Sequence, residues 1–172
     1  LMTYPTPVCH VMMKMLDHPG ANKHDKAHFV KVHSYARSIG LMEGLDADTQ
    51  QTLEVAALVH DIACPLCREK YGKASGVLQE QEGPALALAL LEDVDMPRAA
   101  KDRASWLVGH HHTVDPVDGI DHRILLEADF LVNADEGNKS MENILSVRES
   151  IFRTESGRAM LDAIYGTGPQ GR

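Results

Sequence analysis

The apolar residues of this 172-residue chain recur at the three- and four-residue spacing of helices along nearly the whole sequence. In the segment 25–39, four such residues share one helical face: Phe29, Val32, Ala36 and Ile39. Alternation of apolar and polar residues is scarce, and Thr, Val and Ile rarely cluster as strands require. The sequence therefore predicts an all-α fold, a single-domain helical bundle over residues 1–172.

Capping residues, prolines and glycines set the expected bounds of the helices. The expected helices are 8–16, 25–39, 48–63, 84–91, 97–109, 120–134, 141–152 and 158–164. Pro84 is expected in a first turn, where its missing N–H is harmless. The segment 65–82 is expected to be the longest irregular stretch and to cover a site, because long loops often serve as lids. We expect the tail from about residue 166 to be disordered.

The balance of charge limits the possible partners. With 25 acidic and 17 basic residues the net charge is −8, which disfavours duplex nucleic acid and anionic membranes. A small phosphorylated molecule remains a possible substrate, because bound divalent ions invert the local sign of a pocket. The start Leu1-Met2-Thr3-Tyr4-Pro5 lacks the features of a secretory signal, so we expect a cytoplasmic protein. The oligomeric state stays open.

Several ionisable residues stand inside or beside apolar runs. His60-Asp61 follows the run 55–59, and Asp129 lies between apolar neighbours on both sides. A buried carboxylate without a partner costs several kcal/mol, so two of them in apolar helices point to a bound cation. Imidazole and carboxylate together suit transition metals such as Zn, Fe, Mn or Ni.

The ordered set His33, His60-Asp61 and Asp129 resembles the H…HD…D signature of the HD-domain metal-dependent phosphohydrolases. The segment 58–63, Leu-Val-His-Asp-Ile-Ala, is similar to that family's L-x-HDIG, and the resemblance covers roughly residues 24–135. It implies a helical bundle in which His33, His60, Asp61 and Asp129 hold one metal ion.

The run of histidines after residue 109 extends this resemblance. His110-His111 followed by Asp118-Gly119 looks like a segment of the branches with two metals, which implies that His110 and His111 are added ligands and that Asp61 bridges. Glu82 stands near the position where those branches have a further histidine, so it is also a candidate ligand. One or two ions are therefore expected.

Cys64 stands where many relatives have a lysine near the scissile phosphate. The basic residues Arg68, Lys70 and Lys73 are therefore candidates for binding the substrate phosphate, together with His112. The HD-GYP route to cyclic dinucleotides is disfavoured, because the chain has no G-Y-P motif.

By resemblance, the expected function is hydrolysis of a small phosphoester, a nucleotide or related phosphate, by metal-activated water. Asp61 would bridge ions or accept a proton, and His110 or His111, where it is not a ligand, would act as general acid. Two alternatives stay open: a non-catalytic, metal-dependent sensor of a phosphorylated ligand, and a di-iron oxygenase that requires all the added ligands. The remaining histidines are expected at the surface: His10, His18, His24, His28 and His122.

Overall fold

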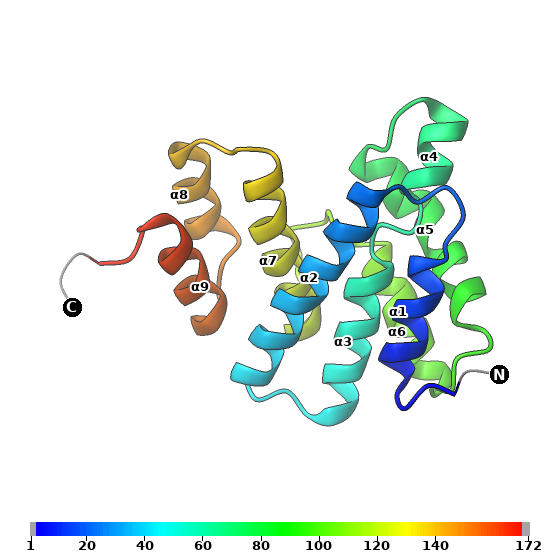
Figure 1. The fold of residues 1–172 in the computed structure, drawn as a ribbon. Coiled ribbons are helices and arrows are strands. Elements are labelled where there is room, and N and C mark those ends of the chain that lie inside the picture. The colour runs from blue at the N-terminus through cyan, green and yellow to red at the C-terminus, as the bar shows by residue number, and fades with distance from the viewer. Residues whose placement is uncertain (1–2, 170–172) are drawn as a thin grey trace.

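A computed structural model describes residues 3–169, and these residues form nine helices without a strand. The predicted all-α fold is thereby confirmed. In chain order the helices are α1 (Pro7–Leu16), α2 (Lys23–Met42), α3 (Ala47–Val59), α4 (Cys64–Tyr71), α5 (Gly76–Leu91), α6 (Arg98–Val108), α7 (Gly119–Glu136), α8 (Met141–Ser150) and α9 (Glu155–Tyr165). Figure 1 shows α8 and α9 as an outer pair beside α7. Within residues 3–169, no helix combines the length and the apolarity needed to cross a bilayer.

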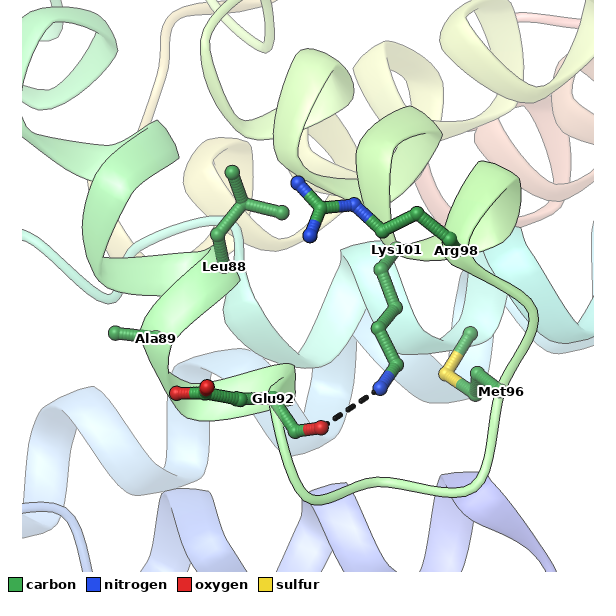
Figure 2. Close-up of a pocket in the computed structure, with 6 residues that line it drawn as sticks. All are labelled: Leu88, Ala89, Glu92, Met96, Arg98 and Lys101. Carbon is green, nitrogen blue, oxygen red and sulfur yellow. Dashed lines mark hydrogen bonds between the residues drawn. The ribbon is translucent and has the colours of Figure 1, made fainter.

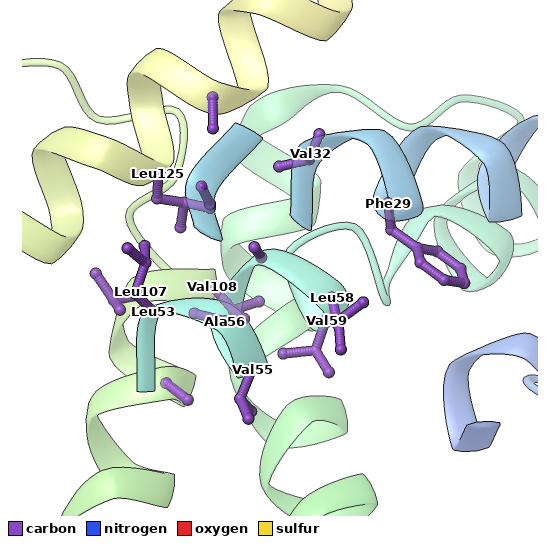
Figure 3. Packing of buried hydrophobic residues seen from close by; sticks show 14 of the residues in the cluster. Phe29, Val32, Leu53, Val55, Ala56, Leu58, Val59, Leu107, Val108 and Leu125 are labelled. Atoms are coloured by element: carbon purple, nitrogen blue, oxygen red, sulfur yellow. The ribbon is translucent and has the colours of Figure 1, made fainter. Parts of the chain in front are cut away.

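Helix α3 is the centre of the fold. Every residue from 52 to 59 is buried, so this helix presents no solvent face over its last two turns. It packs against α1, α2, α6 and α7. Figure 3 shows Leu53, Val55 and Leu58 of α3 surrounded by side chains of the neighbouring helices, among them Phe29 and Leu107. The end of α3 is thus held by packing on several sides, which fixes the positions of His60 and Asp61 directly after it.

The expectation of a long loop over 65–82 is wrong, because most of that segment is helical. Helix α4 starts at Cys64 with Pro65 in its first turn, and Gly72 ends it in the left-handed region with φ 72°. Helix α5 begins soon after, at Gly76. Only a short turn between α4 and α5 is irregular, so the expected lid is absent from this part of the described chain.

Pro84 lies inside α5 and not in its first turn. An interior proline removes one helical hydrogen bond and costs about 3 kcal/mol. Burial offsets this cost, because α5 buries four residues spaced by one helical turn, and α5 packs along α6. These four residues are Gln79, Gly83, Ala87 and Leu91. Tertiary packing therefore overrides the local signal that the proline gives.

The start of the expected disordered tail takes part in the structure. Gly166 ends α9 with φ 65°, and the Thr167 hydroxyl donates a hydrogen bond to Asp162. The expected disorder of the tail from about residue 166 stays a prediction. Residues 170–172 lie outside the described part of the chain.

Candidate metal centre

Five ionisable side chains converge where α2, α3 and α7 meet the end of α6. The Nε2 atom of His28 lies 3.2 Å from Nε2 of His60 and 3.2 Å from Oδ1 of Asp129. Nε2 of His60 lies 3.4 Å from the same Asp129 oxygen. Asp61 joins the group through Oδ2, 3.4 Å from His28 Nε2, and Nε2 of His111 lies 3.3 Å from Asp61 Oδ1. All except Asp61 are buried, and Asp61 keeps a quarter of its side chain exposed.

His60 and His111 gain their orientation from helix ends. His60 is the C-cap of α3, and its Nδ1–H donates to the carbonyl of Ala57 at 2.7 Å. His111 follows the end of α6, and its Nδ1–H donates to the carbonyl of Val108 at 2.7 Å. The last carbonyls of a helix have no partner within the helix, so they are free to accept such bonds. In both rings the Nε2 atom is left as a lone-pair donor that faces the cluster.

The separations among these atoms fit a shared ion. Two nitrogens that each lie about 2.1 Å from one metal at angles near 90–110° are roughly 3.0–3.4 Å apart, and the Nε2 atoms of His28 and His60 are 3.2 Å apart. The potential ligand atoms of His28, His60 and Asp61 lie within 4.8 Å of one another, as do those of Asp61, His111 and His112. The donor set of imidazole nitrogens and carboxylate oxygens suits a transition metal.

Asp61 belongs to both groups and presents a different oxygen to each. Its Oδ2 faces His28 and His60, at 3.4 and 3.5 Å, and its Oδ1 faces His111 at 3.3 Å. A carboxylate with this orientation can bridge two cations, since each oxygen has its own partner.

The electrostatics of the cluster favour a positive charge inside it. Burial alone disfavours protonation of His28, but the hydrogen bond to Asp129 and the charges of Asp61 and Asp129 raise its pKa to about 9. Burial also opposes the charge of Asp61, but His60 and His111 hold its pKa far below the usual range of an aspartate. The pKa of Asp129 is lowered in the same way, against its burial, by His28 and His60. Asp61 and Asp129 both stay ionised, and they favour a metal cation for the same reason that they favour a proton on His28.

The structure brings together His60, Asp61, Asp129 and His111 of the residues that the sequence indicated. His112 lies at the exposed rim, where its Nε2 is 3.2 Å from Oε1 of Gln79. Partial burial of its ring and the neighbouring His111 lower the pKa of His112. His112 therefore completes the second group at the side that faces solvent.

The expected position of His33 beside His60 is wrong. Its Nε2–H donates to Oε1 of Glu54 at 2.9 Å, next to Arg37, and it lines a cavity of about 690 Å³ between α1, α2 and α3. Five residues along a helix correspond to a rotation of about 140°, so His28 and His33 point in different directions from α2. His28 occupies the place that was expected for His33.

His110 also lies outside both groups. Its Nδ1–H donates to the carbonyl of Trp106 at 2.7 Å, and its ring stacks on that indole with centroids 3.8 Å apart. Of the two histidines expected as added ligands, the structure brings His111 to Asp61 and leaves His110 apart from it.

Glu82 is engaged elsewhere, so its expected place beside the cluster is a further correction. Its Oε1 accepts hydrogen bonds from Lys70 Nζ at 2.8 Å and from the Tyr71 hydroxyl at 2.5 Å. Lys73 is exposed in the turn between α4 and α5. The hydrogen bond to Asp25 and the charges of nearby acids, including Asp61, raise the pKa of Arg68.

Two buried histidines were expected at the surface. His28 is 4% exposed and His122 is fully buried, where His122 Nε2–H donates to the carbonyl of His110 at 2.8 Å. The sequence does place His28 beside the core face, four residues before Val32, but it places His33 beside the same face, four residues after Phe29.

A separate cavity of about 310 Å³ lies between α5 and α6 (Figure 2). Lys101 crosses it and donates a hydrogen bond to the carbonyl of Glu92 at 2.9 Å. Its lining contains none of the residues of the metal cluster: Leu88, Ala89, Glu92, Met96, Arg98 and Lys101.

Comparison with known proteins finds a similar structure but no similar sequence family. No family model and no curated protein matches the sequence. The structure is similar to the crystal structure of a predicted HD superfamily hydrolase from an uncultured Thermotogales bacterium, with a TM-score of 0.64 and 25% sequence identity. The match covers 93% of this chain and 83% of that chain. The chain therefore has the all-α fold of HD-domain proteins.

Proposed function

We propose that this protein is a metal-dependent hydrolase that cleaves a small phosphoester, such as a nucleotide or related phosphate. The observation that carries the proposal is the convergence of three imidazole Nε2 atoms on Asp61 and Asp129, with the two oxygens of Asp61 facing two groups of potential ligands. The name of the similar solved structure, a predicted HD superfamily hydrolase, supports the general class of reaction.

In this proposal His28, His60, Asp61 and Asp129 hold one divalent ion, and Asp61, His111 and His112 hold a second. When bound, the metal ion (Fe, Mn, Zn or Ni) would act as a Lewis acid and would lower the pKa of a water molecule bound to it. The residues of the chain fix the geometry, since their rings are locked by Nδ1–H hydrogen bonds and cannot turn away.

Arg68 is the proposed contact for the substrate phosphate. Its side chain is 39% exposed, and it is held by Asp25, which accepts from Arg68 Nη1 at 3.1 Å and from Arg68 Nη2. A guanidinium presents several N–H groups in one plane, so it can keep one carboxylate partner and still donate to a phosphate oxygen. The charge of Asp61 contributes to the raised pKa of Arg68, which supports a place for Arg68 within electrostatic reach of the cluster.

The geometry gives less support to a di-iron oxygenase. That alternative depends on His110 and Glu82 as ligands, and both have other partners in the structure. A sensor that binds a phosphorylated ligand without turnover uses the same cluster, so a measurement of turnover separates it from the hydrolase.

The test combines metal content with a substrate screen. The full chain is loaded in turn with Mn²⁺, Fe²⁺, Zn²⁺ and Ni²⁺, its metal content is measured by elemental analysis, and release of phosphate or alcohol is followed over a panel of phosphomonoesters and phosphodiesters. We expect one or two ions per chain and turnover of at least one substrate class, with loss of both in Asp61→Ala. Asp95→Ala, an exposed residue between α5 and α6, is the matched control and should retain both. Full activity in Asp61→Ala would remove the proposal, and bound metal without turnover over the whole panel would favour the sensor.

A further inference from the structure

Glu136 is a partly buried carboxylate that contacts three basic side chains. Its Oε2 accepts from His28 Nδ1–H at 2.8 Å and lies 3.4 Å from His24 Nε2, and its Oε1 lies 2.8 Å from Lys31 Nζ. The side chain is 14% exposed. Both oxygens of this carboxylate therefore face basic groups at close range.

The need for this carboxylate follows from the place of His28 in its helix. His60 and His111 stand at or after helix ends, where backbone carbonyls are free to accept their Nδ1–H groups. His28 lies inside α2 (Lys23–Met42), where the carbonyls accept bonds from the helix itself. An acceptor for its Nδ1–H must therefore come from another element, and α7 supplies it.

Glu136 stands seven residues after Asp129, which is about two helical turns, so both carboxylates lie on the face of α7 that meets α2. Glu136 is also the last residue of α7, where the helix dipole disfavours a negative side chain. Lys31, three residues after His28 on α2, offsets this cost by pairing with the carboxylate. Glu136 and Asp129, both on α7, therefore contact the two ring nitrogens of His28 on α2.

We infer that Glu136 is a positioning residue that holds His28 in the tautomer with a proton on Nδ1, so that Nε2 is free to bind metal, and that Lys31 keeps Glu136 in place. The inference rests on the metal site of the proposed function. A carboxylate in this role also increases the basicity of the imidazole and so strengthens its bond to a metal ion.

The test is the affinity of the full chain for Zn²⁺, measured by titration calorimetry after removal of metal with a chelator. We expect Glu136→Ala to lower the affinity by about 10- to 100-fold, as is typical for the loss of such a partner. Glu136→Gln keeps an acceptor oxygen but loses the charge, so its affinity should fall between those of the wild type and Glu136→Ala. Asp135→Asn removes the same charge from the neighbouring exposed residue and should bind as the wild type does.

A second readout follows the imidazole itself. At a pH above the raised pKa of His28, about 9, where the ring is neutral, ¹H–¹⁵N correlation spectra of the metal-free protein should show the His28 proton on Nδ1 in the wild type and a mixture of tautomers in Glu136→Ala. Circular dichroism and thermal unfolding show whether each variant is folded. Glu136→Gln has nearly the same side-chain volume as the wild type, so it keeps the test informative where Glu136→Ala does not fold. Unchanged affinity and an unchanged tautomer in Glu136→Ala would overturn the inference while the metal site stands. Failure of the wild type to bind any of the four metals would instead contradict the proposed function, and the inference with it.

Discussion

The Nε2 atoms of His28 and His60 lie 3.2 Å apart, although 32 residues separate the two histidines in the chain. Their Nδ1–H groups are occupied by Glu136 and by the Ala57 carbonyl, so the two Nε2 atoms face each other. The carboxylates around them favour a positive charge at this point, either a proton, as the raised pKa of His28 shows, or a metal cation. The pair therefore defines the point at which a metal ion is expected.

Substitution of His28 and of His33 should have opposite signatures. His28→Ala removes a nitrogen of the cluster, so metal affinity should fall by more than the roughly 10- to 100-fold typical of a lost supporting partner. His33→Ala should leave metal affinity unchanged and lower the free energy of unfolding by about 1–3 kcal/mol, since Glu54 loses a buried hydrogen bond. Zn²⁺ titration and urea unfolding of both variants measure the two effects. Loss of metal binding in His33→Ala alone would contradict the assignment of His28.

Arg68 and Lys70 differ in their place relative to the cluster and should differ in their effect on turnover. Removal of a charge-assisted hydrogen bond costs about 1.5–3 kcal/mol, so Arg68→Met should raise KM for a phosphoester by about ten-fold or more. Lys70 pairs with Glu82, and Lys70→Met should leave KM unchanged. Steady-state kinetics with the best substrate of the screen, together with inhibition by inorganic phosphate, measure this difference. Equal effects of the two variants would indicate that only the net charge of the surface matters.

The sequence predicts the buried part of the site better than its flanks. His60, Asp61 and Asp129 stand within apolar runs, so their burial together is readable from the sequence. The choice between His28 and His33 is not readable in this way, because each lies roughly 60–80° from the middle of the core face of α2, on opposite sides. Only the contacts with α7 decide which flank meets the cluster, and those contacts are set by the tertiary fold.

The same reason explains the errors in the fold. Pro84 favours irregular backbone locally, yet it lies inside a helix, because α5 packs its small residues against α6. Pro65 lies in the first turn of α4, where a proline is compatible with a helix. Glu136 was missed for a related reason, since a glutamate before a glycine at a helix end is typical of solvated surface. Its role appears only when α2 and α7 lie side by side (Figure 1).

Glu54 should make the stability of the protein depend on pH. Burial raises the pKa of a carboxyl, but hydrogen bonds from His33, Gln50 and Arg37 outweigh it, and the pKa of Glu54 lies below its usual range. A lowered pKa in the folded state stabilises the protein above the pKa of the unfolded chain, about 4.3 for glutamate. This stabilisation is lost as the pH falls through the lower, folded pKa.

The test of this effect is urea unfolding between pH 3 and pH 7. Glu54→Gln should lower the free energy of unfolding by about 1–3 kcal/mol at pH 7, and the difference from the wild type should shrink as the pH falls below about 4.3. Glu43→Gln, a carboxylate that accepts from the Ser156 N–H outside this network, is the control. A difference between Glu54→Gln and the wild type that is constant over the whole range would contradict the lowered pKa.

Gly83 sets the distance between α5 and α6 at the point from which His111 is anchored. A Cβ at Gly83 would lie 2.5 Å from Cγ1 of Val108, whereas Cβ of Val108 is 4.0 Å away. Val108 also supplies the carbonyl that holds the Nδ1–H of His111. Gly83→Ala should therefore force α6 outward, lower the free energy of unfolding by about 1–3 kcal/mol, and weaken metal binding through His111.

The matched variant is the double substitution Gly83→Ala with Val108→Ala, because loss of Cγ1 removes the clash. Val108→Ala alone leaves a cavity and destabilises the protein, but in the double variant the new methyl group fills part of that space. A double-mutant cycle from urea unfolding should therefore give a favourable coupling of about 0.5–3 kcal/mol, and Zn²⁺ affinity should return toward that of the wild type. Additive losses would show that the two residues do not touch, and restored stability without restored affinity would separate the packing of α5 on α6 from the orientation of His111.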